Sequence, residues 1–140
     1  MKHILLYILI LSSIVMSQDQ FFVGTRPLGM GGAFIAVADD GNTITWNPAG
    51  LPRLRRKEFT SSYADLYAMN ITHSYAGVVW PFGDRIAIGV DWSNIGFDDQ
   101  ELNYSENKLN FSLGYQPFKM LSLGGTFKYL SRDMGLDGTS

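Results

Sequence analysis

A strict two-residue alternation of apolar with small or polar side chains over residues 86–129 limits the folds open to this chain. Successive side chains of a β-strand point to opposite faces, so a period of two gives each strand one apolar and one polar face. The apolar positions are Ile86, Ile88, Val90 and Trp92, then Leu109, Phe111, Leu113 and Tyr115, then Leu121, Leu123, Phe127 and Tyr129. The pattern predicts antiparallel strands of an all-β protein.

The alternation and the turn residues together predict five strands in the second part of the chain. We expect them over residues 58–67, 72–82, 86–94, 108–116 and 121–130. Gly83 and Asp84 favour a tight turn between the second and third strands, and residues 117–120 turn the fourth strand into the fifth. A long polar loop is expected over residues 95–107.

Residues 1–17 have the pattern of an export signal peptide. A basic start with Lys2 precedes an apolar run over residues 4–15, and Val15 and Ser17 supply the small residues that a signal peptidase recognises. The run is too short to cross a bilayer. The alternative, a buried N-terminal helix, would need a polar face that the run lacks. The chain contains no cysteine, so it relies on no disulfide bond.

An exported chain with amphipathic strands can form either of two all-β architectures. A secreted β-sandwich buries the apolar faces of its two sheets against each other. A transmembrane barrel turns the apolar face outward to lipid and keeps the polar face in the lumen. The sequence has no apolar helix of spanning length, and Trp and Tyr recur near strand ends, as at membrane interfaces. We therefore expect an antiparallel transmembrane β-barrel in a bacterial outer membrane, in contact with outer-membrane lipid.

Aromatic residues flank both short turns, in a weak internal repeat of Trp-Pro-Phe at 80–82 and Gln-Pro-Phe at 116–118. Short turns of outer-membrane barrels face the periplasm. An aromatic girdle is therefore expected at that interface, formed by Trp80, Phe82, Tyr115 and Phe118. Five strands are fewer than the roughly eight of the smallest barrels. We expect residues 57–140 to be the first strands of a longer protein, or several copies of the chain to share one barrel.

Residues 18–56, here called the N-terminal segment, are punctuated by glycine and proline and show little alternation. We expect them to form a compact plug. The residues expected to determine the shape of this plug are Gly29, Gly31, Gly32, Asp39, Asp40, Asn47 and Pro48. The glycines permit close approach or positive φ, the aspartates can cap a helix or pair with Arg26, and Asn47 before Pro48 ends a helical turn. A pocket between plug and wall would be lined by Phe34, Ile35 and Trp46.

The N-terminal segment resembles the signature of PorV/PorQ-like outer-membrane proteins at residues 24–40, GTRPLGMGGAFIAVADD, and 46–51, WNPAGL. It is similar, more distantly, to the FadL family of hydrophobic-compound transporters, which shares the Asp-Asp stretch and the Asn-Pro-Ala turn. Residues 64–66 and 75–82 also resemble the PorV side. The resemblance implies a fourteen-stranded barrel with the N-terminal segment folded inside as a plug.

Three functions follow as hypotheses. A PorV/PorQ-like protein would serve protein secretion or surface attachment, with secretion-system components or exported cargo docking on the loop at residues 95–107. A FadL-like protein would passively transport hydrophobic small molecules such as long-chain fatty acids. A soluble secreted β-protein would bind a partner without a membrane.

The sequence lacks the features that are typical of nucleic-acid-binding proteins and of enzymes. Without residues 1–17, ten basic residues stand against thirteen acidic ones, a net charge of about −3 that does not favour nucleic acid. Phe34 stands where a dinucleotide loop beginning at Gly29 needs its third glycine, and no Walker loop, zinc helix or nucleophile elbow occurs. We expect no enzyme activity, cofactor or metal site.

Overall fold

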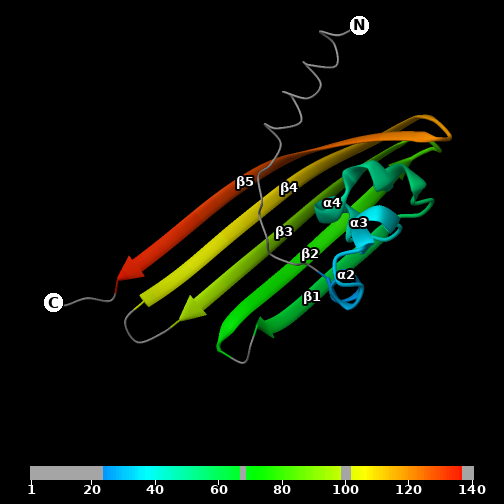
Figure 1. Ribbon diagram of the computed structural model, residues 1–140. Coiled ribbons are helices and arrows are strands. Elements are labelled where there is room, and N and C mark those ends of the chain that lie inside the picture. Colours follow the sequence, from blue (N-terminus) through cyan, green and yellow to red (C-terminus); the bar gives the residue numbers. More distant parts are fainter. Residues whose placement is uncertain (1–23, 67–68, 99–101, 137–140) are drawn as a thin grey trace, which may run out of the picture.

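The computed structural model describes residues 24–66, 69–98 and 102–136, which include one antiparallel sheet of five strands (Figure 1). The strands are β1 (Glu58–Leu66), β2 (Ile71–Phe82), β3 (Ile86–Asp98), β4 (Leu102–Phe118) and β5 (Leu121–Leu136). Each strand pairs with its neighbour in sequence, so the sheet is a meander with β1 and β5 at its edges. The expected all-β class and the five antiparallel strands are confirmed. The predicted signal peptide, residues 1–17, lies outside the described residues.

The polar loop predicted over residues 95–107 is wrong, because most of this stretch continues the ladder between β3 and β4. Ile95 pairs with Glu106, and the pairing reaches Asp98 opposite Asn103. Ladder hydrogen bonds join backbone groups. A strand that already has a partner can therefore continue through polar residues whose own strand propensity is weak.

The other strand limits lie closer to the predictions. β1 and β2 match within one residue where they are described. β5 reaches Leu136 instead of residue 130, because it stays paired with β4. The second short turn is tighter than residues 117–120, since Phe118 already pairs with Leu121.

Register across the strands gathers the apolar side chains on one side of the sheet, the apolar face, and the small and polar ones on the other, the polar face. One row of the apolar face contains Val78, Val90, Phe111 and Phe127. The adjacent row of the polar face contains Gly77, Asp91, Asn110 and Lys128. The predicted period of two is confirmed by this register.

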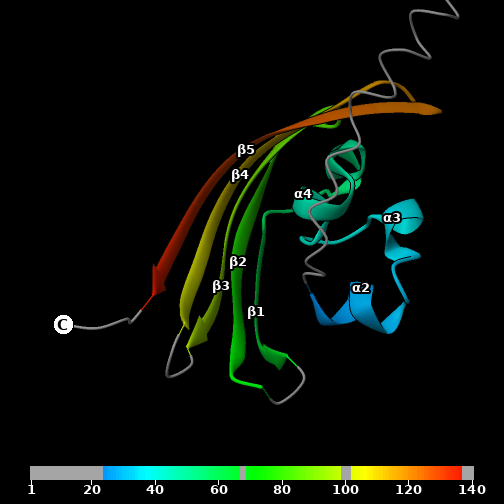
Figure 2. The same cartoon turned by 60° about the vertical axis from the view of Figure 1, so that its left-hand side comes forward.

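The described part of the N-terminal segment folds into short helices on the concave, polar face of the sheet (Figure 2). They are α2 (Thr25–Gly29), α3 (Phe34–Val37), α4 (Thr43–Trp46) and the 3₁₀-helix η1 (Pro48–Arg53). The helical turn expected to end at Asn47 is confirmed by α4, and Asn47 itself is extended, with φ −160° and ψ 92°. Among the described residues, no helix is both long and apolar enough to span a membrane.

A small apolar core joins the N-terminal segment to the sheet. Ile44, Leu51 and Leu54 meet Val79 and Ala87, and all five side chains are at most 5 % exposed. Val79 and Ala87 lie on the polar face, which also carries the buried Ile95. The core of the described structure therefore lies on the polar side of the sheet, and the wide apolar face takes no part in it.

Candidate functional site

The N-terminal segment approaches the polar face where the strands carry glycine. A Cβ atom added to Gly89 would lie 2.6 Å from Cγ1 of Ile44, and one added to Gly114 would lie 2.6 Å from the carbonyl oxygen of Pro48. At Gly124 an added Cβ would collide with the backbone of Pro48 and Ala49. Heavier side chains at these positions would hold the segment away from the sheet. The three glycines therefore form the surface on which α4 and η1 pack.

Hydrogen bonds hold α4 to the same part of the polar face. Thr45 Oγ1 donates to Asp91 Oδ2 at 2.8 Å, and Asn110 Nδ2 donates to Asp91 Oδ1 at 2.7 Å. Ser112 Oγ donates to the backbone oxygen of Ile44 at 3.0 Å. Asp91 is only 1 % exposed, so both of its oxygens depend on these partners in place of water.

A second polar cluster lies nearer the N-terminal end of β4, away from the contacts of α4. Glu106 is 3 % exposed, and its Oε2 accepts hydrogen bonds from Arg132 Nε and from the Tyr104 hydroxyl, both at 2.7 Å. Lys108 Nζ lies 3.9 Å from the other carboxylate oxygen. Charged side chains are thus paired on the polar face, on which His73 is also buried.

Asp91, Asn110 and Glu106 were not among the residues predicted from the sequence to form a site. Asp91 and Asn110 occupy polar-face positions in the same alternation that marked the apolar residues as a set, whereas Glu106 lies in the stretch that was expected to be a loop. The alternation was therefore a signal for Asp91 and Asn110, but it did not reveal which polar residues contact each other. Apart from Tyr104 and Lys108, which lie two positions from Glu106, the partners are 19 or more positions apart in the sequence, such as Asn110 and Asp91.

The expected plug residues take definite positions in the N-terminal segment. Gly31 and Gly32 have φ values of 59° and 82°, which favour glycine, whereas Gly29 is helical in α2 with open space around it. Arg26 Nη1 donates to Asp39 Oδ1 at 2.6 Å and to Asp40 Oδ2 at 2.8 Å. The hydrogen bond from Arg26 holds the pKa of Asp39 below its usual range.

Asn47 and Pro48 link the helices of the segment. The Asn47 side chain accepts a hydrogen bond from the Ala49 amide at 3.2 Å and donates one to the Ile35 carbonyl at 2.9 Å. Pro48 begins η1, and its carbonyl faces Gly114 of the sheet. The Asn47 side chain therefore ties the start of η1 to α3.

The three residues predicted to line a pocket are placed differently from one another. Phe34 is fully buried and meets Trp46 edge to face, with ring centroids 6.3 Å apart. The Arg26 guanidinium carbon lies 5.5 Å from the centroid of the Phe34 ring. Ile35 is 53 % exposed. Phe34 and Trp46 thus belong to the packing of the segment, and Ile35 points away from it.

The apolar face is uncovered in the described structure. The exposed fraction is 53 % for Leu113, 46 % for Phe111 and 69 % for Phe127. The predicted girdle residues lie at the short-turn end of this face and are also exposed: Trp80, Phe82, Tyr115 and Phe118.

The apolar face ends along a sharp line across four strands. In one row of paired positions lie the last apolar residues, Ala76, Trp92, Leu109 and Tyr129. In the next row of the same face lie Ser74, Asn94, Asn107 and Ser131. The apolar residues thus form a band, the apolar band, that begins at the short turns and stops at the same height in β2 to β5.

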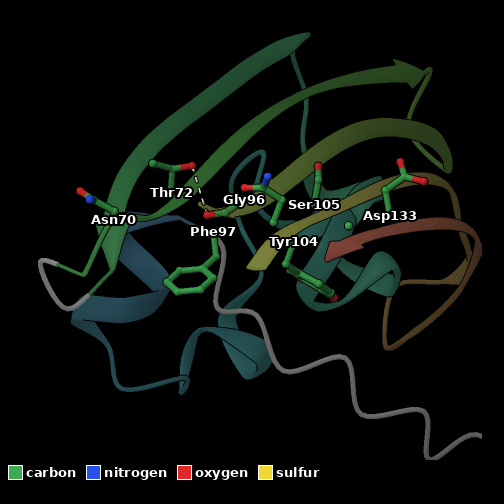
Figure 3. A pocket seen from close by; sticks show the side chains of 9 residues that line it. Asn70, Thr72, Gly96, Phe97, Tyr104, Ser105 and Asp133 are labelled. Carbon is green, nitrogen blue, oxygen red and sulfur yellow. Dashed lines mark hydrogen bonds between the residues drawn. The ribbon is translucent and has the colours of Figure 1, made fainter. Parts of the chain in front are cut away.

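A polar hollow of about 560 Å³ lies past this line, at the other end of the sheet (Figure 3). Thr72, Ser105 and Asp133 point to one side of the strands there, while Phe97 and Tyr104 point to the other. Thr72 Oγ1 donates to the Gly96 carbonyl at 3.4 Å. Within the described residues, no group of three or more His, Asp and Glu side chains is arranged to hold a metal ion.

No protein-family model, curated protein or solved structure matches this chain.

Proposed function

We propose that the sheet is part of the wall of an outer-membrane β-barrel, with the apolar face against lipid and the N-terminal segment inside as a plug. The observation that carries this proposal is the placement of the N-terminal segment on the polar face, which leaves the apolar band uncovered. A sheet that folds in water covers its apolar face first, because burial of apolar area is the main driving force. Exposed apolar patches beyond a few hundred Å² mark interaction or membrane surfaces.

The dimensions of the apolar band support the same proposal. Along β5 the band from Leu121 to Tyr129 is about 26 Å long, at roughly 3.3 Å per residue. A strand tilt of about 40° lowers its height to about 20 Å, close to the band of about 25 Å in outer-membrane barrels. The straight boundary between Tyr129 and Ser131 then corresponds to one edge of the hydrocarbon.

The PorV/PorQ-like role in protein secretion or surface attachment is the more specific part of the proposal. It is supported by the resemblance at residues 24–51, whose Arg26, Asp39 and Asn47 interact within a folded unit on the polar face. Since residues 95–98 and 102–107 belong to strands, a cargo would dock on a β3–β4 end with a shorter loop than expected. Deletion of the gene should abolish surface display of the exported cargo, and unchanged display would contradict the role.

A FadL-like transport role needs apolar space between the N-terminal segment and the wall. A cavity lies there between Leu28 of α2 and Leu66 of β1, with a volume of about 70 Å³. Sites for drug-sized ligands have volumes of about 300–1,000 Å³. The described geometry therefore favours a filled plug over an open lipid path, and uptake of a labelled fatty acid should be unchanged on deletion.

The three tryptophans of the chain allow a direct test of orientation. Trp80 and Trp92 lie in the apolar band, and Trp46 belongs to the N-terminal segment. In single-tryptophan variants with phenylalanine at the other two sites, lipids brominated on the acyl chain should quench Trp80 and Trp92 strongly and Trp46 weakly. Equal quenching of all three, or recovery of the chain as a soluble protein without detergent, would contradict membrane insertion and favour a secreted sandwich.

A further inference from the structure

Basic side chains gather at the short-turn end of the sheet. They come from the end of η1, from the link between η1 and β1 and from both short turns: Arg53, Arg55, Arg56, Lys57, Arg85 and Lys119. The acidic residues described beside them are Glu58, paired with Arg56 at 3.3 Å, and Asp84, paired with Arg55 at 2.8 Å. This end of the sheet therefore carries an excess of positive charge although the whole chain is acidic.

Three of these cations surround one hollow. It has a volume of about 500 Å³, and Arg55, Arg85 and Lys119 line it together with Gln116 and Phe118. Asp84, the acidic residue of the lining, is already engaged by Arg55. Within the described part of the chain, no ion pair involves Arg85 or Lys119, so the hollow has cationic side chains to offer an anion.

The hollow adjoins the exposed aromatic end of the apolar band. Phe118 lines it and is 69 % exposed, and its partner across the ladder, Leu121, is 47 % exposed. Nearby, the Lys57 ammonium lies 3.5 Å from the centroid of the Trp80 ring, so a cation and an aromatic ring already share this border. Positive charge and exposed apolar surface thus meet along one line.

We infer that this hollow binds the phosphate of a membrane glycerophospholipid, whose acyl chains lie along the apolar band beside Phe118 and Leu121. Arginine and lysine are the side chains that bind phosphate oxygens, and basic residues at the bilayer surface attract anionic lipids. A free phosphate would use the cations alone, whereas a lipid also uses the exposed apolar border. The inference rests on the proposed membrane orientation and adds a defined headgroup site at the short-turn side.

The test is a titration of the full chain in detergent with dioleoylphosphatidylglycerol, followed by native mass spectrometry of the bound lipid. The double variant Arg85→Gln/Lys119→Gln should bind about 25-fold more weakly, since each cation near an anionic lipid surface changes affinity about fivefold. The charge-conserving variant Arg85→Lys/Lys119→Arg should bind within a few-fold of the wild type.

A charge-matched control separates the hollow from the general positive charge of this end. Arg53→Gln/Arg56→Gln removes the same two charges from side chains that do not line the hollow, and its affinity should stay within about threefold, because solvent-exposed charges are screened. Equal weakening in both double variants would overturn the site. So would equal affinity for sn-glycerol 3-phosphate, which would identify a soluble phosphate as the ligand.

The outcomes also separate this inference from the proposed function. Quenching of Trp80 and Trp92 by brominated lipid, combined with unchanged lipid affinity in Arg85→Gln/Lys119→Gln, would overturn the headgroup site alone. Absence of quenching would overturn the membrane orientation and, with it, the headgroup site.

Discussion

On the polar face of β4 and β5, Gly114 and Gly124 touch the backbone of the N-terminal segment, while on the apolar face Leu113 and Phe127 are 53 % and 69 % exposed. β4 thus buries its small and polar side chains and exposes its large apolar ones, and the large apolar side chains of β5 are exposed as well. In water this arrangement is the reverse of the usual one. The difference indicates that the two faces are adapted to different surroundings, a folded segment on one side and, in our proposal, lipid on the other.

The sharpest way to break this comparison is a charge in the middle of the apolar band. Leu113→Arg should lower the free energy of unfolding in lipid vesicles by about 2–4 kcal/mol, because the guanidinium would face hydrocarbon. Asn103→Arg is a matched control on the same face of the same strand, past the polar boundary, and should cost about 0–1 kcal/mol. Urea unfolding in vesicles measures both. If both variants change the free energy of unfolding by less than about 0.5 kcal/mol, both sites behave as water-exposed surface, and the apolar band does not face lipid.

The contact with the N-terminal segment can be tested at two adjacent glycines. Gly124→Ala should destabilise the protein by about 1–3 kcal/mol, because its methyl group would collide with Pro48 and Ala49. Gly125 faces the other way, with no atom within 4 Å of an added Cβ. Gly125→Ala should therefore be neutral or stabilising by up to about 1 kcal/mol. Equal stabilities of the two variants would mean that the segment does not sit on β5.

The hydrogen bond between Thr45 and Asp91 gives a smaller and more local effect. Thr45→Val keeps the shape of the side chain but removes the donor to a buried carboxylate, which should cost about 1.5 kcal/mol. A double-mutant cycle with Asp91→Asn measures the coupling between the two residues. If the two substitutions change the free energy of unfolding additively, α4 is held to the sheet only by its apolar contacts and by its packing on the glycines.

The smallest effect is expected at Arg26, whose ion pairs with Asp39 and Asp40 are largely exposed to solvent. Because the pKa of Asp39 is lowered in the folded state, its contribution is complete above its ordinary pKa of about 4 and is lost as the pH falls through the lowered value. The stability difference between wild type and Arg26→Gln should thus be constant from pH 7 to about pH 5 and shrink below pH 4. A difference that grows on acidification would contradict the pairing.

Local pattern was sufficient for much of the fold. The period of two in residues 86–94 and 108–116 predicted both the strands and the division of side chains between faces, because alternation is a property of each strand by itself. Asn47 before Pro48 predicted the end of α4 for an equally local reason. The pattern was less informative over residues 95–107, where polar residues follow a ladder that is maintained by the neighbouring strand.

The sequence by itself determined that the chain has five amphipathic strands and a glycine-rich segment before them, since turns, alternation and proline act over a few residues. Only the tertiary structure decided which face that segment covers. Ile44 packs on Gly89, which is 45 positions away in the sequence, and Pro48 packs on Gly114, which is 66 positions away. The bond from Thr45 to Asp91 likewise depends on register across the whole sheet. Such contacts arise from complementary shape and hydrogen bonding between distant parts of the chain, which no local period encodes.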